Sequence, residues 1–456
     1  MIRGQLPLER RRWPGSVALV TCILLAGCAG LPEPDGFEAA VIESAEELTT
    51  LTPSGEGDVE SVARNGLLRS PTVREAASQI SASADEVRVQ RAALFPELSL
   101  FLGAGTGDAG SGDPAVELTG SQLLFDGGNS QRAIKVADFD LQIRYIAFQK
   151  AVDDALLELL EAYDDVQRQS ELLDIYRRQL NALSELEALV AARVERGAVS
   201  TTDALEAQKR LQSAAFLVND TELALAEARD RLILLSGQSR GGHVRISPPS
   251  CKVRGETDEL LMARLEMGRA KLVLEQAENA RIPRVVLNPV VRGELGTGEL
   301  PVGLNLGIQS DFLQGGALSA RANAERNRHA AAEAELENVS LEDSLEERGL
   351  LRSLASGDRK ADMLRRQIAL LSKTRKLYRS QYFDLGTRQL SELLDNEEEY
   401  YGRQAELVEL HSELAADRLE CAVRHRVLRH ELALEQAKIY GFPLAPLTDT
   451  LFSTLN

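Results

Sequence analysis

Hydrophobic and polar residues alternate with a period of two in four short segments of the chain. The segments cover residues 98–104, 116–124, 285–291 and 302–308. In the first, Leu98, Leu100 and Leu102 share one face, and Ser99 and Phe101 lie between them on the other face. Such alternation predicts β-strands. It is typical of strands that cross a membrane, although half-buried strands of a soluble sheet give the same pattern. The occurrence of the segments in two pairs favours the membrane interpretation.

Two long spans of the chain contain no proline, one over residues 115–247 and one over residues 302–442. Both are rich in Ala, Leu, Glu, Gln and Arg, and proline inside a helix costs about 3 kcal/mol. One row of apolar residues in the first span repeats every seven positions, through Leu159, Val166, Leu173 and Leu180. This spacing is typical of coiled-coil packing. We therefore expect long helices in both spans.

Gly197 and Gly386 divide these helical spans and predict hairpin tips. Gly197 is the only glycine between residues 129 and 236, and it lies 69 residues after Gly128. In the second half, Gly386 lies 70 residues after Gly316. Each half thus has the order strand, strand, long helix, tip and returning helix, which indicates an internal duplication. A helix of this length extends about 100 Å, which suits a gap-spanning tube better than an enzyme.

The N-terminus predicts a lipoprotein signal peptide over residues 1–27. Arg10–Arg12 are followed by an apolar stretch, Val17–Leu25, that is too short for a stable transmembrane helix. Leu25-Ala26-Gly27-Cys28 is similar to a bacterial lipobox. That similarity implies cleavage before Cys28 and acylation of this cysteine, and Ala29 after it implies sorting to the outer membrane. The alternative is an ordinary secretory signal that contains a cysteine.

Proline and glycine are frequent after Cys28 and predict a linker over residues 28–57, which would join the acylated cysteine to the folded body. Ser70 and Pro71 then favour a helix start, with Ser70 as the N-cap and Pro71 at the first helical position. We expect this helix to run to about Leu94.

The composition excludes some functions. The formal net charge is −18, which argues against a nucleic-acid partner because nucleic-acid binding requires a basic face. Aromatic residues make up only 4% of the chain, which fits long helices packed through Leu, Ala and Val better than a compact globular core.

No catalytic motif is present, so we predict neither an enzyme nor a cofactor. His425 follows Cys421 by four residues, a spacing known from metal sites, but no further pair completes such a site and we predict no metal. Cys251 and Cys421 would be the thiols that remain after acylation of Cys28. In an oxidising compartment they could pair or stay unpaired, and the sequence leaves both options open.

Several motifs carry a resemblance to a known family. They are Phe383-Asp384-Leu385-Gly386-Thr387-Arg388 followed by Glu392 and Asp395, Arg193-Val194-Glu195-Arg196-Gly197 followed by Ser200 and Asp203, and Leu124-Phe125-Asp126-Gly127-Gly128. Over roughly residues 60–440 the chain resembles the TolC family of outer-membrane exporters. The resemblance implies a mainly α-helical protein with membrane β-strands that assembles as a homotrimer.

In that assembly each protomer would give four strands to a twelve-stranded β-barrel and two helical hairpins to a long periplasmic coiled-coil barrel. Four strands cannot close a barrel alone, and open sheet edges are not viable in lipid. The expected organisation has a first repeat over residues 58–245 with its tip near Gly197, a second over residues 246–440 with its tip near Gly386, and a C-terminal tail over residues 441–456.

The resemblance also implies roles for five residues near the tips. Arg388 matches an arginine that helps to hold the entrance closed, and Asp203 matches the aspartate that it meets on the neighbouring hairpin. Phe383 stands where the family has tyrosine, and it lacks the hydroxyl group. Glu392 and Asp395 match two acids that ring the narrowest point and would favour cations.

Structural roles for the same residues remain open. Ser200-x-x-Asp203 also fits a capping box at the start of the returning helix. Glu392 and Asp395 also fit a solvated helix face with a favourable helix-dipole interaction.

The function implied is a passive exit duct, gated at the tips, of a tripartite efflux or type I secretion system. Its partners would be a periplasmic adaptor (membrane fusion) protein, an inner-membrane ABC or proton-driven transporter, and the lipid of the outer membrane. The duct would be lipid-anchored there, with palmitate on Cys28, and extend into the periplasm. The tip motifs look closer to secretion ducts, whereas the lipobox is commoner in drug efflux. A periplasmic adaptor and a pore-free coiled-coil lipoprotein are the competing classes.

Overall fold

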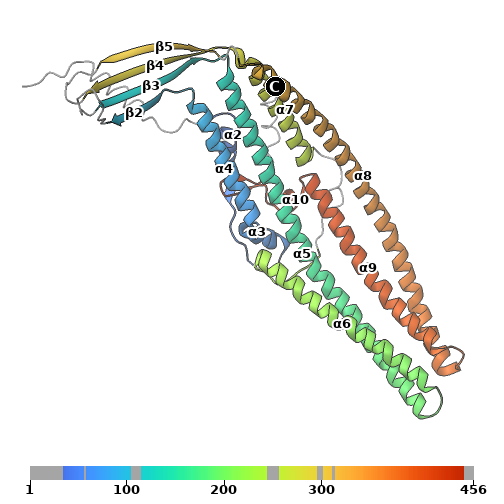
Figure 1. Ribbon diagram of the computed structural model, residues 1–456. Helices are drawn as coiled ribbons and strands as arrows, with labels where there is room; N and C mark the ends of the chain where they lie inside the picture. Colours follow the sequence, from blue (N-terminus) through green and yellow to red (C-terminus); the bar gives the residue numbers. More distant parts are fainter. Residues whose placement is uncertain are drawn as a thin grey trace, which may run out of the picture. The chain divides into compact units, whose positions relative to one another are not determined.

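The structure is a computed structural model that describes residues 34–55, 58–103, 115–243, 256–294, 301–310 and 314–445. The secondary-structure elements of the described residues, labelled in Figure 1, are α2 (Phe37–Glu46), β1 (Thr49–Thr50), α3 (Val59–Arg69), α4 (Pro71–Ala92), β2 (Glu97–Gly103), β3 (Ala115–Phe125), α5 (Asn129–Glu195), α6 (Thr201–Ser236), α7 (Asp258–Glu278), η1 (Asn279–Arg281), β4 (Arg284–Glu294), β5 (Val302–Gln309), α8 (Ala317–Ser380), η2 (Gln381–Leu385), α9 (Leu390–Arg424), α10 (Leu428–Glu431), β6 (Ala437–Ile439) and β7 (Phe442–Pro443). The chain is mainly helical.

The chain divides into two compact units, and each unit takes segments from both halves of the sequence. One unit is made of Met1–Glu38, Ala82–Leu141 and Arg269–His329; the other is made of Ala39–Ser81, Gln142–Gly268 and Ala330–Asn456. The division therefore cuts across the two sequence halves.

The first unit contains an antiparallel sheet in the order β2-β3-β4-β5, whose strands lie side by side in Figure 1. Leu100 pairs with Leu118, Leu118 with Val291, and Val291 with Val302. The four strands coincide with the four alternating segments, so the strand prediction is confirmed. Within the described residues, β2 and β5 each have one edge without a partner strand.

Both edge strands of this sheet expose large apolar side chains. The exposed apolar residues of β2 and β5 are Leu98, Leu100, Phe101, Leu102, Val302, Leu304, Leu306 and Ile308. Ile308 is 71% exposed and Leu304 is 69% exposed. Exposed apolar areas of this kind mark contact with a partner or with lipid.

Long helices make up most of the second unit, although the first residues of α5 and α8 belong to the first unit. The first predicted span forms α5, of 67 residues, and α6, of 36. The second span forms α8, of 64 residues, and α9, of 35. A helix of 67 residues is about 100 Å long. The predicted long helices are confirmed, and so is the start at Ser70, whose hydroxyl accepts a hydrogen bond from the amide of Val73 at 3.4 Å.

One core of the second unit packs α3 against α5 and α6. Its buried residues are Val62, Leu159, Ala162, Tyr163, Val166, Leu173, Leu225, Ala228 and Leu232. Gly66 makes this packing possible, because a Cβ atom at this position would lie 2.2 Å from the side chain of Leu159. Three of the predicted heptad residues, Leu159, Val166 and Leu173, thus belong to this core.

The prediction of a plain linker over residues 28–57 is wrong in its second half. Phe37–Glu46 form α2, and Thr49–Thr50 pair in parallel with Ala437–Ile439. Phe37 is 2% exposed and Leu51 is 4% exposed, so these apolar side chains stabilise the segment in spite of its many prolines and glycines.

The start of the predicted C-terminal tail is also part of the fold. Phe442–Pro443 form β7, which pairs with β6, and Leu444 is fully buried. Gln149 donates a hydrogen bond to the Pro443 carbonyl at 3.0 Å. The apolar side chains of this segment and its backbone bonds explain why it packs against α5.

Among the described helices, none has the length and apolar character needed to cross a bilayer.

Candidate gate at the hairpin tips

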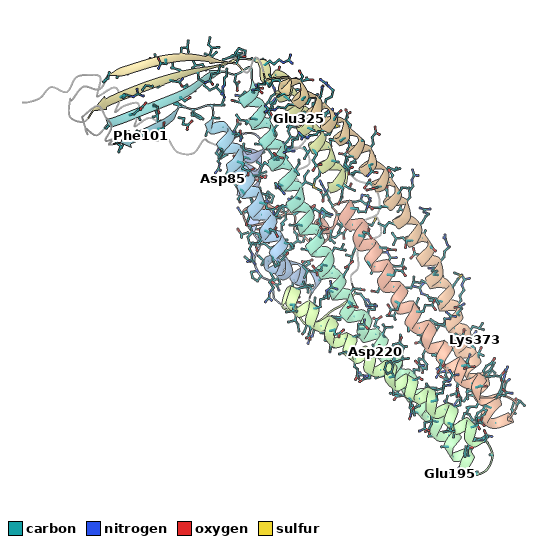
Figure 2. The ribbon with its side chains drawn as sticks, viewed as in Figure 1. Asp85, Phe101, Glu195, Asp220, Glu325 and Lys373 are labelled. Carbon is teal, nitrogen blue, oxygen red and sulfur yellow. The ribbon has the colours of Figure 1, made fainter. Side chains whose placement is uncertain are left out.

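Two glycines in left-handed conformations reverse the chain at the tips of the helical hairpins. Gly197, with φ of +68°, separates α5 from α6, and Gly386, with φ of +64°, separates η2 from α9. Glu195, the last residue of α5, is labelled at the end of its hairpin in Figure 2. Glycine adopts this backbone conformation without the steric penalty that other residues carry. Both predicted tip positions are therefore turns in the structure.

The two tips share one hydrophobic core. Its buried residues come from α5, α6, η2 and α9 and are Leu183, Leu186, Val190, Ala207, Ala214, Tyr382, Leu390, Leu393 and Leu394. Leu393 and Leu394 are fully buried, and they directly follow Glu392 in the sequence. The acidic side chain of Glu392 therefore lies on a helix whose opposite face is fixed in this core.

Asp203 serves as a capping residue at the start of α6. Its amide donates to the Ser200 hydroxyl at 3.2 Å, and its carboxylate accepts from the Ser200 amide at 3.3 Å. These two bonds form the capping box that the sequence permits. Burial raises the pKa of Tyr382, and the charge of Asp203 raises it further, so the two residues are electrostatic neighbours.

Arg388 bonds within its own hairpin. Its guanidinium donates to Gln381 Oε1 at 3.0 Å and to Glu392 Oε1 at 2.9 Å, and it lies 4.2 Å from the ring centroid of Tyr378. The hydrogen bond from Arg388 lowers the pKa of Glu392 below its ordinary value. In the described part of this single chain, no hydrogen bond or ion pair joins Arg388 to Asp203.

Arg210 of α6 binds the second acidic residue of the predicted ring. Its guanidinium lies 2.9 Å from the Asp395 carboxylate, contacts Glu398 as well, and bonds Glu206 of its own helix at 2.9 Å. Burial lowers the pKa of Arg210, but the hydrogen bond to Glu206 and the charges of Glu398 and Asp395 outweigh this and raise it. One carboxylate of the predicted ring is thus held by a cation from the other hairpin.

Arg193, near the end of α5, forms a second link between the hairpins. It donates to the Tyr382 carbonyl at 3.2 Å and lies 5.2 Å from the ring centroid of Tyr382 and 5.8 Å from that of Phe383. The two rings meet edge to face with centroids 4.8 Å apart. The sequence pointed to the Arg193–Gly197 motif without assigning a role to its first arginine.

Of the three cysteines Cys28, Cys251 and Cys421, the structure describes Cys421. Cys421 is 2% exposed and forms a disulfide bond, so it offers no thiolate to a metal beside His425. Cys28 and Cys251 lie outside the described residues. Within the described ranges, no group of three or more His, Cys, Asp or Glu side chains could hold a metal ion.

Comparison with known proteins agrees with this architecture. The family model "Outer membrane efflux protein" matches residues 62–238. Protein CyaE of Bordetella pertussis is 26% identical over 202 residues, which are 42% of this chain and 43% of CyaE. Nodulation protein T of Rhizobium leguminosarum is 22% identical over 448 residues, which are 89% of this chain and 92% of that protein.

Solved outer-membrane channels have the same fold. The outer membrane protein VceC of Vibrio cholerae superposes with a TM-score of 0.73 at 16% sequence identity, over 82% of this chain and 95% of VceC. At this identity the likeness concerns the fold. Over residues 62–238 the chain is thus similar to outer membrane efflux proteins, and its fold is that of solved outer-membrane channels.

Proposed function

We propose that the protein is the outer-membrane exit duct of a tripartite export system, and that three copies assemble into one channel. The observation that carries the proposal is the four-stranded sheet, whose apolar side chains are exposed and whose two edges have no partner strand in the described part of the chain. Such a sheet is not viable in lipid, because its edge amide and carbonyl groups have no water to bond. Three copies that share edges would form a closed barrel of twelve strands.

The long helical hairpins support the periplasmic part of this proposal. α5 and α8 have 67 and 64 residues, and they return through α6 and α9. Their exposed apolar residues include Phe216, Leu223 and Leu234 on α6 and Met363, Leu370 and Leu377 on α8. In a trimer these residues would be covered by neighbouring protomers, which form the helical tunnel.

The duct would be passive and would receive its substrate from a periplasmic adaptor protein and an inner-membrane transporter. We place the gate at the tips near Gly197 and Gly386. Arg388, Asp203 and Phe383 are its proposed latch, with contacts to neighbouring hairpins in the assembly. Glu392 and Asp395 are the proposed carboxylates at the narrowest point, where repeated copies would favour cations.

The remaining proposals concern processing and the duplicated architecture. Residues 1–27 would be removed as a signal peptide, and Cys28 would carry the lipid, palmitate included, that anchors the protein in the outer membrane. The repeats, 58–245 and 246–440, would be the products of an internal duplication, since each contributes two strands and one helical hairpin.

Planar-bilayer recording tests the channel. Purified full-length protein should run as a trimer and give cation-selective pores. A homogeneous trimer without conductance would contradict the proposal and favour a pore-free coiled-coil lipoprotein. Radiolabelled palmitate should label the wild type but not Cys28→Ser. Labelling of the serine variant would remove the lipid-anchor proposal and leave the channel proposal untouched.

A further inference from the structure

Arg193 makes three contacts with the second hairpin, although it belongs to the first. It donates to the main-chain carbonyl of Tyr382 at 3.2 Å and lies over the rings of Tyr382 and Phe383. We propose that Arg193 is the residue that latches the two tips of one protomer together, through aromatic faces and a backbone carbonyl. This inference rests on the proposed tip gate and adds to its latch a contact within one protomer that helps to keep the gate closed.

The chemistry of the latch requires rings and not hydroxyl groups. A guanidinium is attracted to the negative face of an aromatic ring, and the attraction grows as the pair leaves water. Tyr382 is 6% exposed, and among the described residues its hydroxyl has no hydrogen-bond partner. The side chain therefore holds Arg193 with its ring, while its backbone carbonyl fixes the position of the guanidinium.

This geometry explains how a gate can work with Phe383. Phenylalanine cannot donate the hydrogen bond of a tyrosine, but it presents an equivalent ring face. The edge-to-face contact between Tyr382 and Phe383 orients both rings toward the same guanidinium. The loss of the hydroxyl at this position therefore removes nothing that the latch uses.

The other link between the two hairpins, through Arg210, differs in its physical nature. Arg210 meets the carboxylates of Asp395 and Glu398, and the Asp395 side chain is 62% exposed. Salt screens such an exposed ion pair. The Arg193 contact involves uncharged partners, so it should keep its strength in high salt. High salt should therefore weaken the Arg210 link and leave the Arg193 link unchanged, so one experiment at two salt concentrations distinguishes them.

The test is single-channel recording of the full-length trimer in planar bilayers. Arg193→Ala should lower the ratio of closed to open time, by roughly 2- to 30-fold per protomer, in low and in high salt alike. Arg196→Ala is the matched control, because Arg196 is an exposed arginine three residues along the same tip. Arg193→Lys should have an intermediate effect, since lysine keeps the charge but loses the planar guanidinium.

Aromatic variants separate the ring from the hydroxyl. Tyr382→Phe and Phe383→Tyr should gate like the wild type, whereas Tyr382→Leu and Phe383→Leu should open more often. If Tyr382→Phe loosens the gate as much as Tyr382→Leu, a hydroxyl bond to Asp203 is the true latch, and the proposal is overturned. Trimer formation by each variant confirms that it has folded.

The outcomes also distinguish this inference from the proposed function. Absence of pores in the wild-type trimer would remove the channel itself. Pores that gate normally, with Arg193→Ala identical to Arg196→Ala, would leave the channel in place and refute the latch.

Discussion

Arg429 lies fully buried against Asp153, with hydrogen bonds of 2.8 and 2.5 Å to the two carboxylate oxygens. Its remaining donors reach the Leu444 carbonyl at 2.6 Å and the side chain and backbone of Gln149. Burial lowers the pKa of Arg429, but the carboxylate of Asp153 outweighs this and keeps it raised. The arginine thus joins α5 to the C-terminal segment.

The variant Arg429→Met should lower the free energy of unfolding by about 3 to 5 kcal/mol, because Asp153 would remain as a buried, unpaired charge. Denaturant titration followed by circular dichroism measures this change. Arg231→Met is the control: Arg231 pairs with Glu158 at 3.3 Å, but both side chains are 53% exposed. That surface pair should be worth about 1 kcal/mol or less. Equal effects at the two sites would contradict the prediction.

A second prediction concerns the backbone of Ala433. This residue has φ of +52°, and the amides of Ala433 and Leu434 bond carbonyls of the preceding helix α10. Glycine is preferred at such a helix end because it has no Cβ atom to clash. Ala433→Gly should therefore stabilise the protein by about 0.5 to 1 kcal/mol. Ala334→Gly, at an exposed position inside α8, should destabilise it by about 1 kcal/mol.

Two histidines should affect the pH dependence of stability with opposite signs. Burial and the neighbouring charge of Arg365 lower the pKa of His411 below 6.5, its ordinary value. The folded protein then binds the proton more weakly than the unfolded chain. The contribution of His411 to the free energy of unfolding is present above pH 6.5 and is lost as the pH falls through the lowered pKa. His411→Gln should flatten this acid-side loss in unfolding titrations.

His430 provides the comparison of opposite sign. The hydrogen bond to Glu435, 2.9 Å long, raises the pKa of His430 above 6.5. The contribution of His430 to the free energy of unfolding is present below pH 6.5 and is lost as the pH rises through the raised pKa. His430→Gln should therefore remove stability only on the acidic side. For each variant, the loss of unfolding free energy relative to the wild type can be plotted against pH. If the two plots had slopes of the same sign, they would be inconsistent with these contacts.

The last prediction concerns block by polyvalent cations. Glu392 and Asp395 are three residues apart on α9, and their side chains are 44% and 62% exposed. If they line the narrowest point, the double variant Glu392→Gln, Asp395→Asn should lose most of the block of conductance by hexamminecobalt and become less cation-selective. Glu399→Gln, which removes one exposed carboxylate from the same helix, is the control. Undiminished block in the double variant would show that the carboxylates line another surface.

The sequence alone predicts the regular elements well because each depends on local patterns. Period-two alternation located β2 to β5, and the proline-free spans, divided at Gly197 and Gly386, located α5, α6, α8 and α9. α2 and β1 escaped this reasoning because their stability depends on distant partners. Thr49, for example, bonds Gln436, which lies 387 residues away.

The candidate site shows the same limit. The capping role of Asp203 could be foreseen, because Ser200 lies three residues before it. The Arg193 link could not be foreseen, because its partner Tyr382 is 189 residues away. A contact between a guanidinium and a ring face also has no characteristic spacing in the sequence. Arg210 was missed for the same reason, as its partners Asp395 and Glu398 lie on the other hairpin.

The edges of β2 and β5, which have no partner strand among the residues that the structure describes, also bear on the biogenesis of the protein. An unassembled chain presents two rows of backbone groups that can pair with any extended peptide, its own kind included. Such mispairing is avoided when these strands stay unstructured until the copies associate. If three copies share one barrel as proposed, we expect the helices to fold first, with the sheet completed only as the copies assemble. The yield of channel should then fall when chains are produced faster than they can find one another in the correct register.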